Sequence, residues 1–372
     1  MFGRKQKGHL GIDFGAGGIK VIQLQKREGE AKLFTYGFSE FTPEETSMDY
    51  LENPQGAGEL LKKICAKART TTTSAAAALP IPSVFSAVIS IAQVPKKEIS
   101  AAVQWEAKKL VPLPLDEVVL DFKELKVGKE TPPPRSEGSG VGAPTPKASG
   151  SIEVLLTAAP KSIIERYLAV AKSAGITLTS LETEAFALIR ALLGSDPTPT
   201  VIVDIGALRS NILVVDRGIP MLTRSVEIGG KKCTEAIAQG MGVTLTQAEA
   251  MKRDLGSVPL PGGALSATTA TVPGGLPALL QEVFQPLLNE LRYSFNVYRT
   301  RNVVARQVER IMLTGGGAGI PGLAEFLTGE FNLRAFLGNP WEKVGFHPDL
   351  KDHLDAFGTK FSVAVGVALR NL

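Results

Sequence analysis

Apolar residues alternate with small or polar residues along the start of the chain, which predicts two strands joined by a tight turn. Asp13 stands where the first strand ends, and Gly15 to Gly18 form the turn. A third strand and a helical period follow, so the order of elements predicts an α/β protein. The predicted elements are strands at 11–13, 19–24, 32–39, 74–79 and 86–92 and a helix at 58–68.

The turn at Gly15 to Gly18 carries almost no side chains, so its backbone N–H groups can approach an anion closely. Lys20 returns toward the same point from the second strand. Asp13 would repel a phosphate directly, so we expect it to orient the hydration shell of a divalent cation. Taken alone, the stretch also fits an ordinary hairpin with a glycine-rich loop.

A small α/β subdomain is predicted between residues 81 and 178. It contains a helix at 99–110 that Pro112 and Pro114 stop, and strands at 118–125 and 152–159 that can pair as a hairpin. Residues 128–150 between these strands are rich in Pro, Ser and Gly and predict a disordered loop. An amphipathic helix at 162–174 completes the segment.

Residues 200–215 repeat the opening pattern, with Asp204 and Gly206 in the places of Asp13 and Gly15. A repeated supersecondary unit implies duplicated domains. Two Asp-x-Gly turns that face each other across a cleft would hold opposite sides of a phosphate chain. The repeat therefore favours a shared ligand site over the ordinary hairpin.

A third glycine-rich turn, Gly315-Gly316-Gly317, follows a strand predicted at 308–314. Glycines at a strand-to-helix turn allow a flat ring to lie against the backbone. The other elements predicted in this half are helices that begin near Gly229–Gly230 and at 246–255, 279–300, 320–327 and 361–369, with a mobile loop at 257–277.

Composition narrows the class of protein. The formal net charge of +4 over 372 residues is too small to indicate a nucleic-acid surface. The N-terminus lacks the apolar core of a signal peptide, and no apolar run is long enough to predict a transmembrane helix. Two solitary cysteines, Cys65 and Cys233, fit a reducing cytoplasm, and the three histidines are not at zinc-ligand spacing.

The order of these turns resembles the nucleotide site of the actin, hexokinase and Hsp70 superfamily. That site consists of a first phosphate turn, a connecting helix, a second phosphate turn, an adenosine turn and a closing helix. The corresponding stretches, which span the chain, are 13–20, 184–192, 204–210, 314–317 and 363–370. Lys20, seven residues after Asp13, is similar to the actin branch.

Within that branch the chain resembles the PilM family of type IV pilus assembly proteins. The matching stretches are 1–3 with 10–15, Val94-Pro95 before 105–107 with Pro112 and Pro114, Gly229-Gly230 with Glu249 and Lys252, 290–294, and 313–317. The resemblance implies a duplicated, actin-like (ribonuclease H-like) two-domain fold with an inserted subdomain of the FtsA and PilM type. The implied parts are 1–80 with 179–198 and 356–372 for the first actin-like domain, 81–178 for the inserted subdomain, 199–227 with 302–355 for the second actin-like domain, and 228–301 for its upper subdomain.

The resemblance also implies ATP and Mg²⁺ in the cleft between the domains. Asp13 and Asp204 would hold the metal through water, and Glu184 is a candidate for orienting a catalytic water or for a structural role at a helix N-terminus. The implied nucleotide contacts are Asp13, Gly15, Ala16, Gly17, Gly18 and Lys20 on one side of the phosphates, Asp204 and Gly206 on the other, Gly229, Gly230, Lys231, Glu249 and Lys252 around the ribose and base, and Gly315, Gly316 and Gly317 beneath the adenine.

Two positions depart from the superfamily pattern. Ala16 replaces the usual Ser or Thr, and Ala207-Leu208-Arg209 follow the second turn where efficient hydrolases place small polar residues. We therefore expect at most slow ATP hydrolysis, with nucleotide binding shaping a groove for a partner.

The implied partner is the N-terminal cytoplasmic peptide of the inner-membrane protein PilN, held between the first domain and the inserted subdomain. Pilus motor ATPases and self-association are further candidates, and the membrane is expected to be reached only through PilN, from the cytoplasm. A small-molecule kinase of the same superfamily is the alternative function. An FtsA-type filament would need an amphipathic tail after Leu372, and an Hsp70-type chaperone would need a substrate domain.

Overall fold

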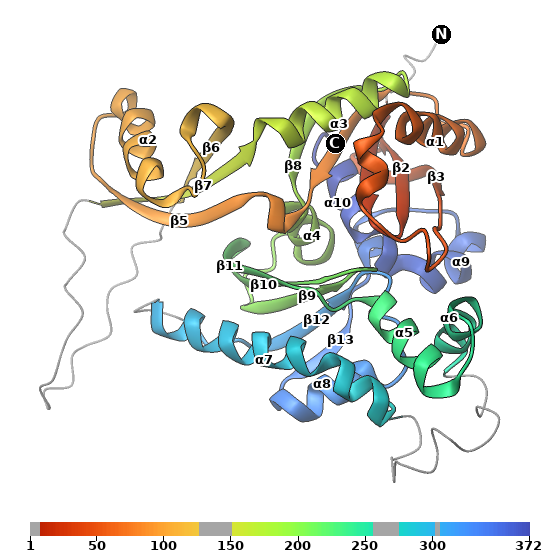
Figure 1. Ribbon diagram of the computed structural model, residues 1–372. Coiled ribbons are helices and arrows are strands. Elements are labelled where there is room, and N and C mark those ends of the chain that lie inside the picture. The colour runs from red at the N-terminus through yellow and green to blue at the C-terminus, as the bar shows by residue number, and fades with distance from the viewer. Residues whose placement is uncertain (1–7, 126–150, 256–274, 302–305) are drawn as a thin grey trace, which may run out of the picture. The chain divides into compact units, whose positions relative to one another are not determined.

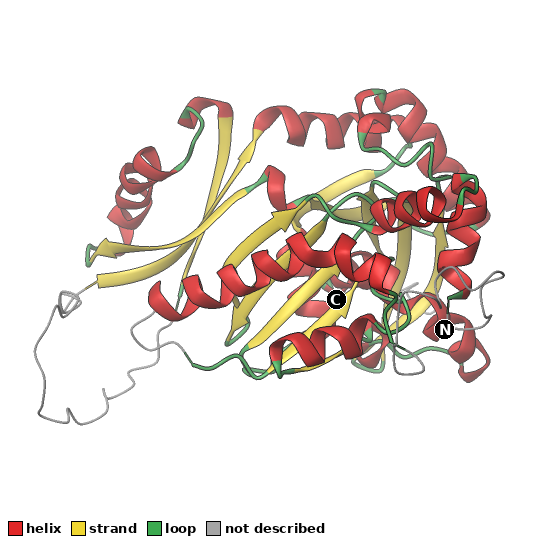
Figure 2. Cartoon of the chain, turned by 60° about the horizontal axis from the view of Figure 1, so that its bottom comes forward, coloured by secondary structure: helices red, strands yellow, loops and turns green. Residues whose placement is uncertain are grey.

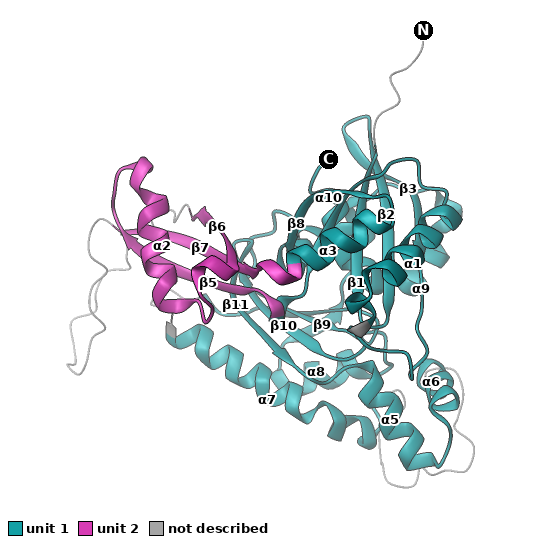
Figure 3. Ribbon diagram, turned by 45° about the horizontal axis from the view of Figure 1, so that its top comes forward, with its two compact units in different colours: residues 1–82, 164–372 teal, residues 83–163 magenta. Residues whose placement is uncertain are grey.

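The computed structural model describes residues 8–125, 151–255, 275–301 and 306–372 (Figure 1). The predicted disordered loop 128–150 and most of the predicted mobile loop 257–277 lie outside these residues. The chain divides into two compact units (Figure 3). The first comprises Met1–Pro82 and Ile164–Leu372, and the second comprises Ser83–Ile163.

The first unit contains two five-stranded sheets. Strands of the first sheet lie in the order β3-β2-β1-β4-β8. The pairs β3–β2 and β2–β1 are antiparallel, whereas β1–β4 and β4–β8 are parallel. The strand bounds are β1 His9–Gly15, β2 Gly18–Arg27, β3 Glu30–Phe38, β4 Ser74–Leu79 and β8 Thr177–Thr183.

The second sheet repeats this pattern. Its order is β11-β10-β9-β12-β13, again with two antiparallel pairs followed by two parallel pairs. The strands are β9 Thr200–Ile205, β10 Ser210–Asp216, β11 Ile219–Val226, β12 Arg310–Thr314 and β13 Arg334–Leu337. The sheet-level repeat explains why the Asp-x-Gly pattern occurs twice, since each copy closes the first hairpin of its sheet.

Helices cover the faces of these sheets, and Figure 2 shows the long α7 running across the second sheet. One face of the second sheet packs with α5, α7 and α8 into an apolar core that includes Val203, Phe284 and Leu287. On the first sheet, Tyr167 of α3 packs edge-on against Phe14 of β1. The helices are α1 Pro54–Lys67, α3 Lys161–Ser173, α5 Gly230–Met241, α6 Leu245–Asp254, α7 Ala278–Arg301, α8 Leu323–Phe331 and α9 Lys351–Phe357.

A second core is shared by both sheets and is built around α4 (Glu184–Leu188) and α10 (Ser362–Leu369). The chain continues from α4 as a π-helical turn, Ile189–Leu193. Seven of the eight residues of α10 are buried. A Cβ atom on Gly366 would lie only 1.9 Å from the carbonyl oxygen of Ala187. The two helices therefore pack backbone against backbone.

The second unit is a three-stranded antiparallel sheet of order β5-β7-β6, covered on one face by α2 (Ile99–Leu110). Its strands are β5 Phe85–Ala92, β6 Val118–Glu124 and β7 Ser151–Pro160, so the predicted pairing of 118–125 with 152–159 is confirmed. The unit ends at Ile163, short of the predicted boundary at 178. The difference arises because Tyr167 of α3 packs on the first unit. The division of the first unit into further domains stays a prediction.

Among the strands and α-helices of the described residues, β8, β11, β13 and α9 were not predicted. The strand β13 has only 4 residues, and β8 (Thr177–Thr183) carries only two apolar residues among polar ones. None of the helices within the described ranges combines the length and the apolar character needed to cross a membrane.

Candidate functional site

The first turn lies between β1 and β2, where Gly15 pairs with Gly18 and Asp13 pairs with Lys20. Lys20 Nζ lies 3.2 Å from Asp13 Oδ2, and both side chains are largely buried. The predicted return of Lys20 toward Asp13 is therefore found. The pairing follows from the strict antiparallel register, which places the two side chains on one face of the hairpin.

The second turn, between β9 and β10, is closed by a hydrogen bond from Gly206 N to the carbonyl oxygen of Arg209 (2.9 Å). Asp204 precedes it, and Asn211 Nδ2 donates to Asp204 Oδ2 at 3.4 Å. The backbone nitrogen atoms of Gly230 and Lys231 donate to the carbonyl oxygens of Gly206 and Ala207. The start of α5 is thereby fixed to the second turn.

The two turns approach each other. A Cβ atom on Gly17 would lie 3.1 Å from the Cβ atom of Ala207. Glu184, at the first position of α4, connects the same two sheets, because its Oε2 atom accepts from Ile81 N (3.0 Å) and from Asn211 Nδ2 (3.4 Å). Asp13, Asp204 and Glu184 thus face one region.

The third turn reaches the same place. Gly315 has φ +86°, and a Cβ atom there would lie 2.5 Å from Asp204 Oδ1. Gly317 N donates to the carbonyl oxygen of Ile205 (2.8 Å). Only glycine fits at position 315, since both the backbone conformation and the space exclude a side chain.

The carboxyl groups perturb one another. Burial, together with the charges of Asp204 and Asp13, raises the pKa of Glu184 to about 8. Burial also raises the pKa of Asp204 to about 6, again with a contribution from Asp13, while the hydrogen bond from Asn211 opposes the shift. Such a cluster of acids favours either protonation or a nearby cation.

Tyr167 and Tyr50 border this region, although neither was predicted. The Tyr167 hydroxyl is buried and has no hydrogen-bond partner among the described residues. Its pKa lies well above the ordinary value because of burial, and the charges of Glu184 and Asp13 contribute. Tyr50 donates from its hydroxyl to the carbonyl oxygen of Gly15 (3.3 Å). No local sequence motif identifies these two tyrosines as site residues, because only the tertiary fold brings their rings to this region.

The predicted ribose and base residues form a neighbouring group on α5 and α6. Lys252 Nζ donates to the carbonyl oxygen of Gly230 (3.0 Å), to Thr234 Oγ1 (2.8 Å) and to Glu249 Oε2 (2.6 Å). Lys252 and Glu249 therefore anchor α6 on the first turn of α5. This group joins the acidic region through the bond between Gly230 and Gly206.

Residues 39–53, which we call the strap, connect β3 to α1 and cross the first turn. Phe41 N donates to the carbonyl oxygen of Gly17 (3.1 Å). Glu40 Oε1 accepts from Lys360 Nζ (2.6 Å), and Glu40 Oε2 lies 3.6 Å from Arg253 of α6. Burial alone would raise the pKa of Glu40, but the hydrogen bonds and charges of Lys360 and Arg253 together outweigh it and lower this pKa. Lys231 Nζ also donates to the carbonyl oxygen of Thr46 (3.3 Å).

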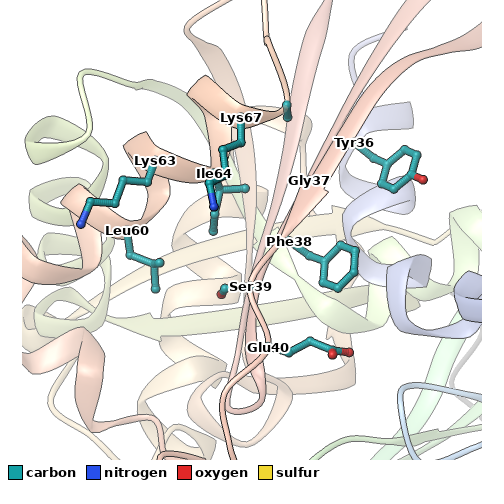
Figure 4. Close-up of a pocket in the computed structure, with 10 residues that line it drawn as sticks. Tyr36, Gly37, Phe38, Ser39, Glu40, Leu60, Lys63, Ile64 and Lys67 are labelled. Atoms are coloured by element: carbon teal, nitrogen blue, oxygen red, sulfur yellow. The ribbon is translucent and has the colours of Figure 1, made fainter.

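A cavity of about 460 Å³ lies between α1 and β3, beside the strap (Figure 4). Leu60 and Ile64 of α1 and the small residues Gly37 and Ser39 line it, whereas the rings of Tyr36 and Phe38 point away from α1. Those two rings pack instead against Phe357 and Phe361. None of the three central carboxylates lines the cavity, so it is separate from the region where the turns meet.

A family model described as type IV pilus assembly protein PilM matches residues 11–137 and 140–372. The chain belongs to the PilM family. Its fold is similar to that of a PilM–PilN type IV pilus biogenesis complex, with 26% identity, a TM-score of 0.77 and 98% of each chain covered. The predicted family and actin-like fold class are thus confirmed, and the family match favours pilus assembly over the small-molecule kinase.

One more distant structure shares the fold. The ethanolamine utilization protein EutJ from Carboxydothermus hydrogenoformans is 15% identical, with a TM-score of 0.53 and coverage of 98% of this chain and 89% of that chain. MreB5 of Spiroplasma citri bound to AMPPNP is 13% identical, with a TM-score of 0.49 and coverage of 98% and 96%.

Proposed function

We propose that this chain binds ATP with a hydrated Mg²⁺ ion where its three turns meet, and that it acts as a nucleotide-dependent scaffold in type IV pilus assembly. The observation that supports this proposal most strongly is the approach of Gly17 to Ala207 with Asp204 beside Gly315. Three backbone segments with few side chains and a surrounding acid cluster converge on one region. A triphosphate with its cation matches that combination of exposed N–H groups and carboxylates.

The residues fit a metal held through water. Within the described ranges, no three His, Cys, Asp or Glu side chains lie close enough to coordinate one ion directly. Mg²⁺ retains several waters when it binds with phosphates, so Asp13 and Asp204 need only accept hydrogen bonds from those waters. The ion would neutralise phosphate charge, and it would also relieve the repulsion among the acids, which adds to the effect of burial in raising the pKa values of Asp204 and Glu184.

Each side of the nucleotide has a proposed set of contacts. Lys20 and the backbone of Gly15 to Gly18 would hold phosphates from the first sheet, and Gly206 would hold them from the second. The pair Glu249–Lys252 keeps Gly230 in position at the start of α5, where Gly229 and Gly230 would border the ribose. Gly315 to Gly317 would border the adenine ring.

Glu184 is poorly suited to act as a fast catalytic base. Its pKa of about 8 keeps the carboxyl mostly protonated near pH 7, and its Oε2 atom already accepts from Ile81 N. Ala16 supplies no hydroxyl to the phosphates. These features support slow turnover at most, so we assign the site to nucleotide sensing.

The proposed partner is the N-terminal cytoplasmic peptide of a PilN protein, because the similar solved structure is a PilM–PilN complex. Such a partner would hold the chain at the inner membrane from the cytoplasmic side. Pilus motor ATPases and other copies of the chain remain predicted partners.

The test measures ATP binding by calorimetry for the wild type and for Asp13→Ala, with Asp121→Ala on β6 as the control. We expect Asp13→Ala to lose most of the affinity and the control to keep it. Equal binding by all three proteins would contradict the assigned site. Capture of a labelled PilN N-terminal peptide, with and without ATP and Mg²⁺, then tests the scaffold role, and peptide binding that ignores nucleotide in the wild type would contradict the coupling.

A further inference from the structure

The outer face of α2 in the second unit carries an exposed tryptophan among lysines. Trp105 is 64% exposed, the highest value among the large apolar side chains of the described residues that are exposed. The helix buries its opposite face, Ile99, Val103 and Ala107, against the three-stranded sheet. The exposure of Trp105 therefore follows from its position on the helix and leaves the core intact.

Four lysines accompany this ring. Lys96 and Lys97 precede the helix, and Lys108 and Lys109 lie in its last turn. Positions 101, 105 and 108 share one side of the helix by their spacing, and Lys97 lies in the turn that leads into it. Lys109 Nζ lies 5.9 Å from the centroid of the Trp105 ring. We call the surface made by these four lysines, Ala101 and Trp105 the α2 outer face.

The charge of the α2 outer face is net positive. The acidic side chains of the same segment are Glu98 and Glu106, and Glu106 is paired with Lys109 at 2.8 Å. Four lysines against two glutamates leave an excess of positive charge beside an amphipathic aromatic ring. That combination is complementary to an anionic surface.

We propose that the α2 outer face binds the surface of an anionic phospholipid bilayer. Tryptophan rings favour the headgroup region of a membrane, and lysine side chains extend their charge toward lipid phosphates while their stems lie on apolar surface. A protein partner is less favoured, because protein interfaces are enriched in arginine and depleted in lysine. The described residues of this unit contain lysine but no arginine.

The contact is expected to be weak and sensitive to salt. A few lysines and one ring give far less attraction than an inserted helix, so this face would orient a protein that a partner already holds at the membrane. It does not require nucleotide. Its test therefore stays informative if the proposed ATP site is wrong.

The chain supplies its own reporter, because it contains two tryptophans and the second, Trp341, is buried with its indole nitrogen donating to the carbonyl oxygen of Leu354. We expect the emission of Trp105 to shift to shorter wavelength with vesicles that contain phosphatidylglycerol. It should stay unchanged with phosphatidylcholine alone. The shift should disappear at about 1 M salt, where charges are screened beyond about 3 Å.

The decisive variant is Lys97→Gln with Lys108→Gln, which we expect to lower vesicle partitioning about thirtyfold. The matched control, Lys62→Gln with Lys63→Gln, removes the same charge from exposed positions of α1 and should partition as the wild type. Trp105→Ser should also lose partitioning while its thermal midpoint stays unchanged. Absence of a shift with anionic vesicles, or equal loss in both double variants, would overturn the proposal. A shift produced by a soluble polyglutamate peptide and not by vesicles would assign the face to an acidic protein instead.

Discussion

Asp13, Glu184 and Asp204 show how far single residues could be identified from the sequence. Both Asp-x-Gly motifs were recognisable in the sequence, because each has an aspartate at the end of an apolar strand and glycine in the turn that follows. Asn211 and Tyr167 could not be found this way. Asn211 bridges Asp204 and Glu184 only because α4 lies against the second sheet. Tyr167 lies within the electrostatic influence of Glu184 and Asp13 because α3 packs on β1.

The buried acid at position 184 predicts a pH dependence of stability. Its pKa is about 8 in the fold against an ordinary value of 4.5, so the folded protein binds more protons than the unfolded chain between these values. The free energy of unfolding should therefore fall as pH rises from about 4.5 to about 8. In thermal melts without nucleotide, Glu184→Gln should flatten this fall and melt higher than the wild type near pH 8. Glu59→Gln, on the exposed side of α1, should follow the wild type, and parallel curves for all three proteins would refute the assignment.

Lys20 lies beside the first turn, with its Nζ atom 3.2 Å from Asp13 Oδ2. Lys20→Met should weaken ATP binding by about tenfold to a hundredfold, the value of a charged hydrogen bond to phosphate. Lys26→Met removes the same charge from the far end of β2 and should leave the affinity unchanged. Calorimetric titration distinguishes the two variants, and equal affinities would exclude a phosphate contact for Lys20.

At the scale of elements, the strongly periodic segments were predicted well, whereas short strands and boundaries were not. The predicted bounds of α2 are the observed ones, because prolines stop it and an apolar face defines it. The strand β8 was missed because its residues alternate too weakly in polarity. The pairing of β8 with β4 supplies the stabilisation that its own sequence lacks.

The approach of the first and second turns can be tested directly. Gly17→Val places a branched side chain where a single Cβ atom would already lie 3.1 Å from Ala207. We expect the two turns to separate and the ATP-induced rise in melting temperature to shrink strongly. Gly319→Val has open space around it and serves as the control. If Gly17→Val responded to ATP as the control does, the turns would not act together.

The contacts of the strap are expected to affect the rate at which nucleotide dissociates. Its contacts through Glu40 and Thr46 reach Lys360 and α5 and α6, so they join the two sides of the site. Because the side chain of Glu40 is partly exposed, we expect the loss of its ion pairs to reduce the stabilisation of the bound nucleotide by at most about 1 kcal/mol. Glu40→Gln should thus release a fluorescent ATP analogue up to about fivefold faster in stopped-flow measurements. Glu44→Gln, exposed on the same strap, should not change the rate.

At the scale of the molecule, the repeat of one sheet topology accounts for most of what the sequence revealed. The predicted inserted subdomain runs to residue 178, whereas the second compact unit ends at Ile163, because α3 continues directly from β7 and its Tyr167 packs on the first sheet. No local pattern distinguishes a helix that closes an insertion from one that covers the neighbouring sheet.

If ATP binds with Mg²⁺, the free energy of unfolding of the whole protein should rise on binding, and the rise should depend on the metal. ATP at about a hundred times its dissociation constant should stabilise the folded state by about 2.7 kcal/mol. Replacing Mg²⁺ with a chelator should remove most of this gain, since the buried acids would then face the phosphates without a cation. Differential scanning calorimetry with ATP and either Mg²⁺ or chelator measures the effect. An unchanged gain under chelation would argue against a metal at this site.

The contact of Gly366 with Ala187 has a consequence for motion. At this contact, which we call the seam, α4 and α10 meet with no side chain between their backbones, so they cannot approach further, and separating them would expose buried residues of α10. Rotation about that seam costs least, because it preserves the contact. The seam would then serve as a pivot. A change of bound nucleotide would rotate one sheet relative to the other about this contact, and the displacement would be largest far from it.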